Sequence, residues 1–524
     1  MAGAGAVPAA ANGGAALATS GSLPARIRRL TNAELDASIT ALLGVESKLA
    51  STFTPDTRQT GFTRNDAQRV DPVFMTQLDA AAKQVASAAK GKLDQLAPCT
   101  DPNAGGEACA RTFLASFLPR AYRRPATPRE LDALFSLYKV GAAGATYADG
   151  IAVVIQAVLE SPGFLYVTEL GDAPTPAPTR LTDHEIATAL AYLLTGAPAD
   201  DALQNAAKAS QLQQPELRKQ HAQRLLMQPA AAAQIARMVQ QWLGIDRIAD
   251  TAKDSKVYPD FEGLRPAMQK EADTFVSEVL WKQKGGIAEL FTADWTPAED
   301  ALARMYLNLQ PGAQINRTDG HVSLSSVRRR GILNQAAFLS VYAHAHETAP
   351  VLRGVNVLRK VACFNVPAPT SLNVNIVPPV QDPNKTTRER FAIHSKDPAC
   401  AACHTNIDPI GFSFEWLDGM GKERSMENNH PIDSSSQLHA GLSFDGNYTD
   451  SGALSMQIAQ STELASCFAR HLYRSAAARN TEGEGSETAY MQQAQALPAG
   501  VRGKVEDLLL AFIASDLFVT RGAP

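Results

Sequence analysis

The chain has 524 residues, of which 45% are hydrophobic and 19% are charged, and its formal net charge is −4. This length predicts about two to four domains, and the composition is that of an ordinary globular protein. The small negative charge gives no general basis for binding nucleic acid or an anionic membrane. The sequence contains no run of about 18 apolar residues, which is the length that a helix needs to span a bilayer. Two basic clusters, Arg26–Arg29 and Arg328–Arg330, are flanked by helical sequence and are expected on solvated faces.

The first 24 residues have too few large apolar side chains to form a hydrophobic core. Residues 1–24 are rich in Ala and Gly, without the basic start of a signal peptide. We expect a disordered linker, left after processing or added at the chain end.

A helical domain is predicted over residues 25–170. Its first helix runs from Pro24 to Gly44 with the capping box Thr31-Asn-Ala-Glu34, and further helices are expected over 62–95, 109–117, 127–140 and 147–165.

A proline-rich linker at residues 171–179 predicts the main domain boundary. The capping box Thr182-Asp-His-Glu185 follows it and opens a helical bundle predicted over residues 180–310. The arginines of residues 120–125 could bind an anion, but pairing with carboxylates is the interpretation that we favour.

A third ordered domain is predicted over residues 325–524. Helices are expected over 330–342 and 351–363, and two more close the chain. Residues 367–383 form an irregular crossover, and residues 433–448 could form a small hairpin. Almost no segment alternates with period two, so the predicted fold class is mainly α, multi-domain, with at most one small β-hairpin.

The six cysteines divide into three pairs. Cys99 and Cys109 bracket a short loop that can close a local disulfide, and Cys363 and Cys467 are then left to pair with each other. An even count without an orphan suits an oxidising compartment. The alternative, that these four cysteines are buried thiols of a reduced protein, stays open.

The third pair belongs to the motif Cys400-Ala-Ala-Cys403-His404. Two cysteines three residues apart, followed at once by histidine, are the attachment pattern of c-type haem, in which His404 would be the proximal iron ligand. A redox dithiol or metal site and a structural disulfide are the alternatives. The dithiol lacks βαβ surroundings, and a zinc site lacks a second Cys/His cluster, so we expect one covalent haem c, in a cytochrome c-like domain over 325–524.

Several short motifs occur in one order along the chain, and together they resemble a known family of exported, cytochrome-associated proteins of planctomycetes and myxobacteria, built from consecutive domains of unknown function. The matching segments are residues 29–35, 120–125, 181–187, 330–333, 350–354, the haem motif with Asp408-Pro-Ile-Gly411, and residues 468–479. The resemblance covers residue 26 to the end and implies an exported, mostly helical protein with one c-type-like haem motif. Residues 475–479 and Met420 depart from the family pattern.

The distal side of the haem has several candidates. The resemblance places a histidine at His344, and His346 lies two residues on; Met420 is a second candidate ligand, although filling of a loop is its simpler role. His394 is too close to Cys400 to cross the ring easily. Arg353 and Arg424 are candidates for pairing with the haem propionates, and ordinary surface pairing with carboxylates is the alternative for both. Structural roles are expected for Asp408 and Asp418.

The resulting hypothesis is an exported mono-haem c-type cytochrome, periplasmic, cell-surface or secreted, that transfers electrons to a redox partner. A first alternative is a peroxidase-like haem oxidoreductase with an open distal site, in which His344 or His346 would assist a bound peroxide. A second is an adhesion or scaffold module without haem, in which Cys400 and Cys403 form a disulfide. The sequence specifies neither substrate nor redox partner nor oligomeric state.

Overall fold

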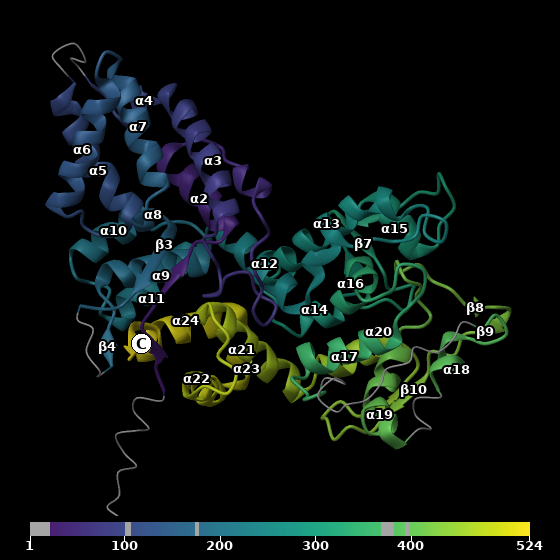
Figure 1. Ribbon diagram of the computed structural model, residues 1–524. Coiled ribbons are helices and arrows are strands. Elements are labelled where there is room, and N and C mark those ends of the chain that lie inside the picture. The colour runs from purple at the N-terminus through teal and green to yellow at the C-terminus, as the bar shows by residue number, and fades with distance from the viewer. Residues whose placement is uncertain (1–20, 100–105, 173–177, 368–381, 393–397, 524) are drawn as a thin grey trace, which may run out of the picture. The chain divides into compact units, whose positions relative to one another are not determined.

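The computed structural model describes residues 21–99, 106–172, 178–367, 382–392 and 398–523. Most of them are helical and the strands are short, which confirms the predicted mainly-α fold (Figure 1). None of the helices in these ranges combines the length and apolar character needed to cross a membrane. Residues 1–20, most of the 171–179 linker, most of the 367–383 crossover and His394 lie outside the described residues.

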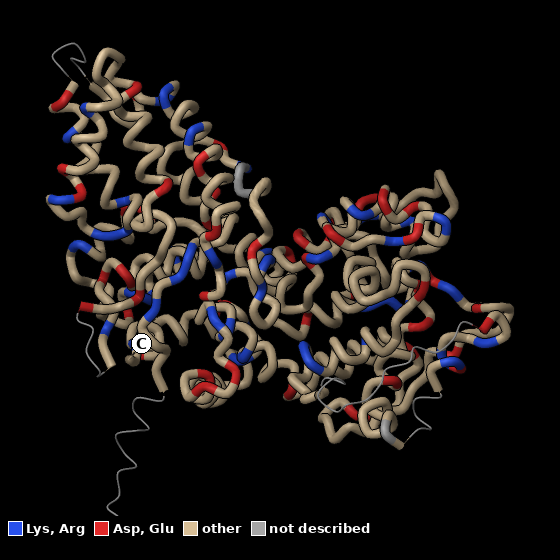
Figure 2. The backbone as a smooth tube through the Cα atoms, viewed as in Figure 1, with Lys and Arg blue, Asp and Glu red and all other residues tan. Residues whose placement is uncertain are grey.

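The chain divides into two compact units. Unit 1 comprises residues 1–234, 473–493 and 509–524, and unit 2 comprises residues 235–472 and 494–508. Two C-terminal segments therefore belong to unit 1, which differs from the continuous domain predicted over 325–524. Basic and acidic residues are mixed along the chain in both units, in keeping with the small net charge (Figure 2).

Unit 1 is built mainly from helices, and those between residues 32 and 165 share one apolar core. Its elements are β1 (Leu23–Pro24), β2 (Arg26–Arg29), α2 (Asn32–Leu43), the 3-10 turn η1 (Leu49–Thr52), α3 (Pro72–Lys90), α4 (Leu93–Leu96), α5 (Glu107–Tyr122), α6 (Pro128–Ala142), α7 (Tyr147–Leu159), α8 (Pro162–Leu165), β3 (Tyr166–Glu169), β4 (Thr179–Arg180), α9 (Asp183–Thr195), α10 (Asp201–Lys208), α11 (Pro215–Leu226), α25 (Asp516–Val519) and β12 (Thr520–Gly522). Four further helices carry residues of both units: α12 (Pro229–Leu243), α21 (Thr462–Ala477), α22 (Gly485–Ala496) and α24 (Val505–Ala514).

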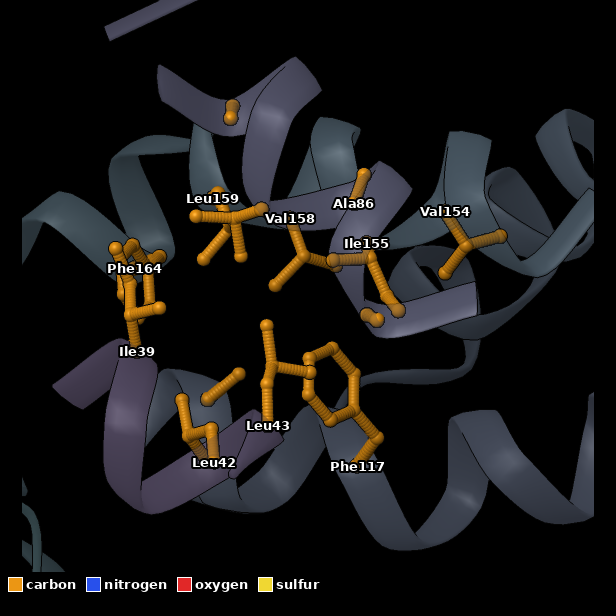
Figure 3. Packing of buried hydrophobic residues seen from close by; sticks show 14 of the residues in the cluster. Ile39, Leu42, Leu43, Ala86, Phe117, Val154, Ile155, Val158, Leu159 and Phe164 are labelled. Atoms are coloured by element: carbon orange, nitrogen blue, oxygen red, sulfur yellow. The ribbon is translucent and has the colours of Figure 1, made fainter. Parts of the chain in front are cut away.

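Local sequence signals determine where the helices of unit 1 begin and end. The capping boxes at Thr31 and Thr182 are both formed, and Gly44 ends α2 with a positive φ of 59°. The apolar side chains of α2 at Leu35, Ile39, Leu42 and Leu43 are buried, and Leu43 packs in the core with Phe117 and Val158 (Figure 3). Burial of such side chains, at about 1.5–3 kcal/mol each, holds these helices together.

The helix expected from Pro24 is wrong in its first part. Residues 26–29 form β2, which pairs antiparallel with β3, and β1 and β4 flank β12 in a three-stranded sheet. These strands have two to four residues, too few to show a period-two pattern. Ordered structure therefore starts before residue 25, inside the segment predicted to be disordered.

The basic cluster at the start of unit 1 is buried, which corrects the expectation of a solvated face. Arg28 is 2% exposed and forms an ion pair with Glu34 at 2.6 Å. Arg26 and Arg521 both bind the carboxylate of Glu169, at 2.9 and 2.6 Å. Burial opposes ionisation of Glu169, but the two arginines overcome it and hold its pKa well below the ordinary value. The cluster thus connects the strand β2 to β3 and β12.

Unit 2 contains the remaining helices and three small sheets, one of which is the predicted hairpin β10–β11. Its elements are the 3-10 turn η3 (Ile245–Asp250), α13 (Phe261–Ser277), the π-helical turn η4 (Glu278–Lys282), α14 (Glu289–Thr292), β5 (Trp295–Thr296), α15 (Asp300–Leu307), β6 (Arg317–Thr318), β7 (His321–Ser323), η5 (Ile332–Asn334), α16 (Ala336–Val341), α17 (Pro350–Val361), α18 (Thr387–Phe391), α19 (Pro398–Phe412), β8 (Met426–Glu427), β9 (His430–Pro431), β10 (Ser436–Leu438), β11 (Gly446–Tyr448), α20 (Ser451–Ile458) and α23 (Ala499–Arg502).

A buried carboxyl group lies in the core of unit 2. Glu271 of α13 is 1% exposed and accepts hydrogen bonds from Thr296 Oγ1 and, at 2.6 Å, from the Tyr306 hydroxyl. Burial raises the pKa of Glu271 to about 7, although the two hydroxyl donors and the charge of Arg329 lower it in part. Arg329 is itself 1% exposed and lies over the Tyr306 ring, so the second basic cluster is also not wholly on a solvated face.

Both predicted disulfides are formed. Cys99 pairs with Cys109 in unit 1, and Cys363 pairs with Cys467 in unit 2. The alternative of four buried thiols is therefore wrong. Cys400 and Cys403 are free, partly exposed cysteines.

Candidate haem-attachment site

Helix α19 carries the Cys-X-X-Cys-His motif. It begins at Pro398, because proline is accommodated in a first helical turn, where its missing N–H has no intrahelical partner. Cys400 and Cys403 are three residues apart, so their side chains lie on one face, one turn from each other. Both thiols are free and partly exposed, which is the condition for two thioether bonds to one porphyrin.

The histidine of the motif is oriented by a carboxylate on the same helix. His404 Nδ1 lies 2.8 Å from Asp408 Oδ1, and the side chains are 17% and 3% exposed. Four residues separate the two, the spacing at which side chains of one helix face meet. A carboxylate that binds one nitrogen of a metal-ligating histidine fixes the ring and raises its basicity. With Nδ1 used in this way, an iron would be bound through Nε2.

The donor set of α19 therefore fits a c-type haem. It offers two accessible thiols, one turn apart, and directly after them an imidazole whose second nitrogen is already held. Asp408 was expected to have a structural role, and its contact with His404 was not predicted. The i, i+4 spacing from His404 is the sequence signal that could have revealed it.

Helix α19 is positioned by a close antiparallel crossing with α17. A Cβ atom on Gly354 of α17 would lie 2.2 Å from the carbonyl oxygen of Ile407, and one on Gly411 would lie 2.1 Å from that of Pro350. No side chain fits at such distances, so two glycines allow the two backbones to touch. This crossing gives a physical reason for the motifs at residues 350–354 and 408–411.

Arg353 supports the chain that follows α19. It is fully buried, and its guanidinium donates to the carbonyl oxygens of Phe414, Leu417 and Asp418, the last at 2.8 Å. Burial lowers the pKa of Arg353 to about 10, opposed by Glu415. These contacts give Arg353 a structural role, and its pairing with a haem propionate stays a prediction.

Arg424 is also engaged within the protein. Its Nη2 lies 2.8 Å from Glu415 Oε2, its Nη1 lies 3.2 Å from Glu427 Oε1, and its side chain is 21% exposed. This is the carboxylate pairing weighed against a propionate contact. Asp418 has the structural role expected for it, because its Oδ1 accepts from the backbone N–H groups of Met420 and Lys422.

The candidate distal residues lie elsewhere. His344 and His346 are exposed on a loop closed by the Ala343–Thr348 bridge, just before α17 begins. Because the start of α17 contacts Gly411, this loop lies near the carboxyl end of α19. His404 is seven residues before Gly411, about 10 Å along the helix axis. Met420 is 5% exposed in the loop that Asp418 organises. The structure thus joins Asp408 to His404, and distal ligation by His344 or Met420 stays a prediction.

Two cavities of about 590 and 710 Å³ lie in unit 1, and residues 123–125 line both. Arg124 pairs with Glu130 at 2.6 Å, as expected for this segment. Arg123 donates instead to the backbone oxygens of Gly163, Phe164 and Tyr166. These contacts give the two arginines structural roles.

Comparison with known protein families gives four matches, each described as a protein of unknown function. In chain order they are PSD3 (DUF1587) at residues 28–91, PSD5 (DUF1595) at 109–169, PSD4 (DUF1592) at 181–307 and PSCyt3 (DUF1588) at 329–427. Comparison with curated proteins and with solved structures gives no match. The PSCyt3 match contains helix α19, and its name points to a cytochrome-associated domain. These four consecutive domains support membership in a multi-domain family of the planctomycete type.

Proposed function

We propose that the chain is an exported c-type cytochrome that carries one covalent haem on α19 and transfers single electrons to or from a redox partner. The observation that carries the proposal is the arrangement on one helix of two free, accessible thiols and a histidine held by a buried carboxylate. The two formed disulfides are compatible with an extracellular location.

When bound, the haem would supply an iron that changes between the ferrous and ferric states. Cys400 and Cys403 would attach it through thioethers, and His404 Nε2 would bind its iron. Asp408 would hold the His404 ring and increase its electron donation, which favours the ferric state and lowers the reduction potential.

The same contact supports a second candidate, a peroxidase-like haem oxidoreductase. Strong electron donation by the proximal ligand favours cleavage of an O–O bond. The scaffold interpretation required a disulfide between Cys400 and Cys403, and the structure has both cysteines free, which does not favour it.

The test is the visible spectrum of the exported protein from a host that attaches c-type haem. We expect a sharp reduced α-band that survives acid–acetone extraction, and its loss in Cys400→Ala/Cys403→Ala. A flat spectrum from fully matured protein contradicts the proposal. If carbon monoxide leaves the reduced spectrum unchanged, the electron-transfer function is supported. A shift with carbon monoxide shows a reachable iron and favours the peroxidase-like activity.

A further inference from the structure

A second group of metal-ligating side chains lies in unit 2, formed by Cys363, Cys467 and His471. Cys363 lies just after the end of α17, and the other two are four residues apart on α21. One ligand atom from each residue, the two Sγ atoms and a ring nitrogen, lies within 4.8 Å of the others. Within the described residues this is the group whose geometry suits a metal ion.

Two of the three side chains of the group are buried. Cys467 is 2% and His471 is 7% exposed, while Cys363 is partly exposed. The Trp242 ring lies 6.1 Å from the His471 ring and 5.2 Å from Phe468. Trp242 Nε1 donates to the Lys360 carbonyl oxygen, which lies 3.3 Å from Cys467 Sγ. The histidine is thus packed against the buried end of the disulfide.

We propose that this group is a redox-controlled metal site. A dithiol or phosphine reductant supplies two electrons to the Cys363–Cys467 disulfide, two protons are taken up, and two thiols result. The thiols and His471 then bind one Zn²⁺, and the thiol protons are released. Disulfide and zinc are alternative states of one site, and each connects α17 to α21.

The distances support this exchange. In a tetrahedral zinc site, with Zn–S near 2.3 Å and Zn–N near 2.0 Å, neighbouring ligand atoms are about 3.5–3.8 Å apart. The two Sγ atoms and one ring nitrogen of His471 already lie within 4.8 Å of one another, so the three side chains need to move only slightly to reach these distances. Cys467 and His471 share one helix face, so they approach the ion together. Two thiolates and one imidazole leave a fourth position, as in sites that keep a water ligand.

The experiment uses the full-length chain with Cys400→Ser/Cys403→Ser, which removes the competing thiols of α19 and makes the result independent of haem. The protein is reduced with a phosphine, and Co²⁺ is added as a spectroscopic probe and then displaced with Zn²⁺. We expect one equivalent of Co²⁺ with a sulfur-to-cobalt charge-transfer band in the reduced protein. The oxidised protein should show none.

Two variants separate this site from other ligands. His471→Ala leaves the disulfide intact and should weaken Co²⁺ and Zn²⁺ binding at least tenfold after reduction. The matched control is His430→Ala, at an exposed histidine of β9, and it should bind like the parent. Binding that is unchanged in His471→Ala, equal in the oxidised protein, or absent from the reduced parent overturns the proposal.

Discussion

The substitution Glu271→Gln should stabilise unit 2 at alkaline pH and have little effect near pH 4.5. The folded protein raises the pKa of Glu271 from 4.5 to about 7. The folded state therefore holds the proton more tightly than the unfolded state does. The resulting stability is fully present below about pH 4.5 and is lost as the pH rises through 7.

The size of the effect follows from the same shift. At 1.36 kcal/mol per pKa unit, a rise from 4.5 to about 7 corresponds to about 3 kcal/mol. A glutamine has the shape of the protonated carboxyl group and can serve the hydroxyls of Thr296 and Tyr306 at every pH. By pH 8 the variant should exceed the parent in free energy of unfolding by about 3 kcal/mol.

Urea unfolding at pH 4.5, 6, 7 and 8 measures this difference. All four tryptophans (Trp242, Trp281, Trp295 and Trp416) belong to unit 2, so their fluorescence reports on that unit. Glu262→Gln, at a side chain that is 64% exposed, is the control and should show no such dependence. A difference between Glu271→Gln and the parent that stays constant over this range refutes the reasoning.

Three further predictions concern other parts of the molecule. Glu169→Ala leaves two buried arginines without their carboxylate and should destabilise unit 1 by about 3–5 kcal/mol in denaturant unfolding; a loss below 1 kcal/mol would contradict this. Gly354→Ala drives a Cβ into the backbone of α19, and should lower the melting temperature and the yield of attached haem, whereas Gly263→Ala, with open space around it, should change neither. In haem-loaded protein, Asp408→Asn should raise the reduction potential by about 60–120 mV in voltammetry, which is equivalent to a ten- to hundredfold weaker preference for ferric iron. The control Asp433→Asn, at an exposed side chain, should leave the potential unchanged. An unchanged potential in Asp408→Asn would exclude the proposed role of Asp408.

The parts of the fold that depend on neighbouring residues could be predicted from the sequence. The capping box at Thr31 and the stop at Gly44 are local, and the structure has both. The partner of Arg26 is Glu169, 143 residues away, so its buried ion pair has no local signal and the cluster was assigned to the surface.

The same distinction holds at the site. The cysteines and the histidine of α19 lie within five residues, so their motif can be seen in the sequence. The burial of Arg353, in contrast, depends on a loop about 60 residues further on. Its contacts with the carbonyl oxygens of Phe414, Leu417 and Asp418 exist only after α17 and α19 have packed. The support that Arg353 gives to this loop therefore could not be predicted from the sequence near it.

The contact between Glu169 and Arg521 also determines when unit 1 can finish folding. The two residues are 352 positions apart, and β12 completes the sheet that β1 begins. At roughly 5–20 residues per second, ribosomes need roughly 20–70 s to make the intervening chain. During that time Glu169 and Arg26 lack Arg521, and β1 lacks β12, the strand with which it pairs. Unit 1 is therefore expected to reach its native state only after β12 has been synthesised, and a nascent chain kept open in this way would remain accessible to chaperones.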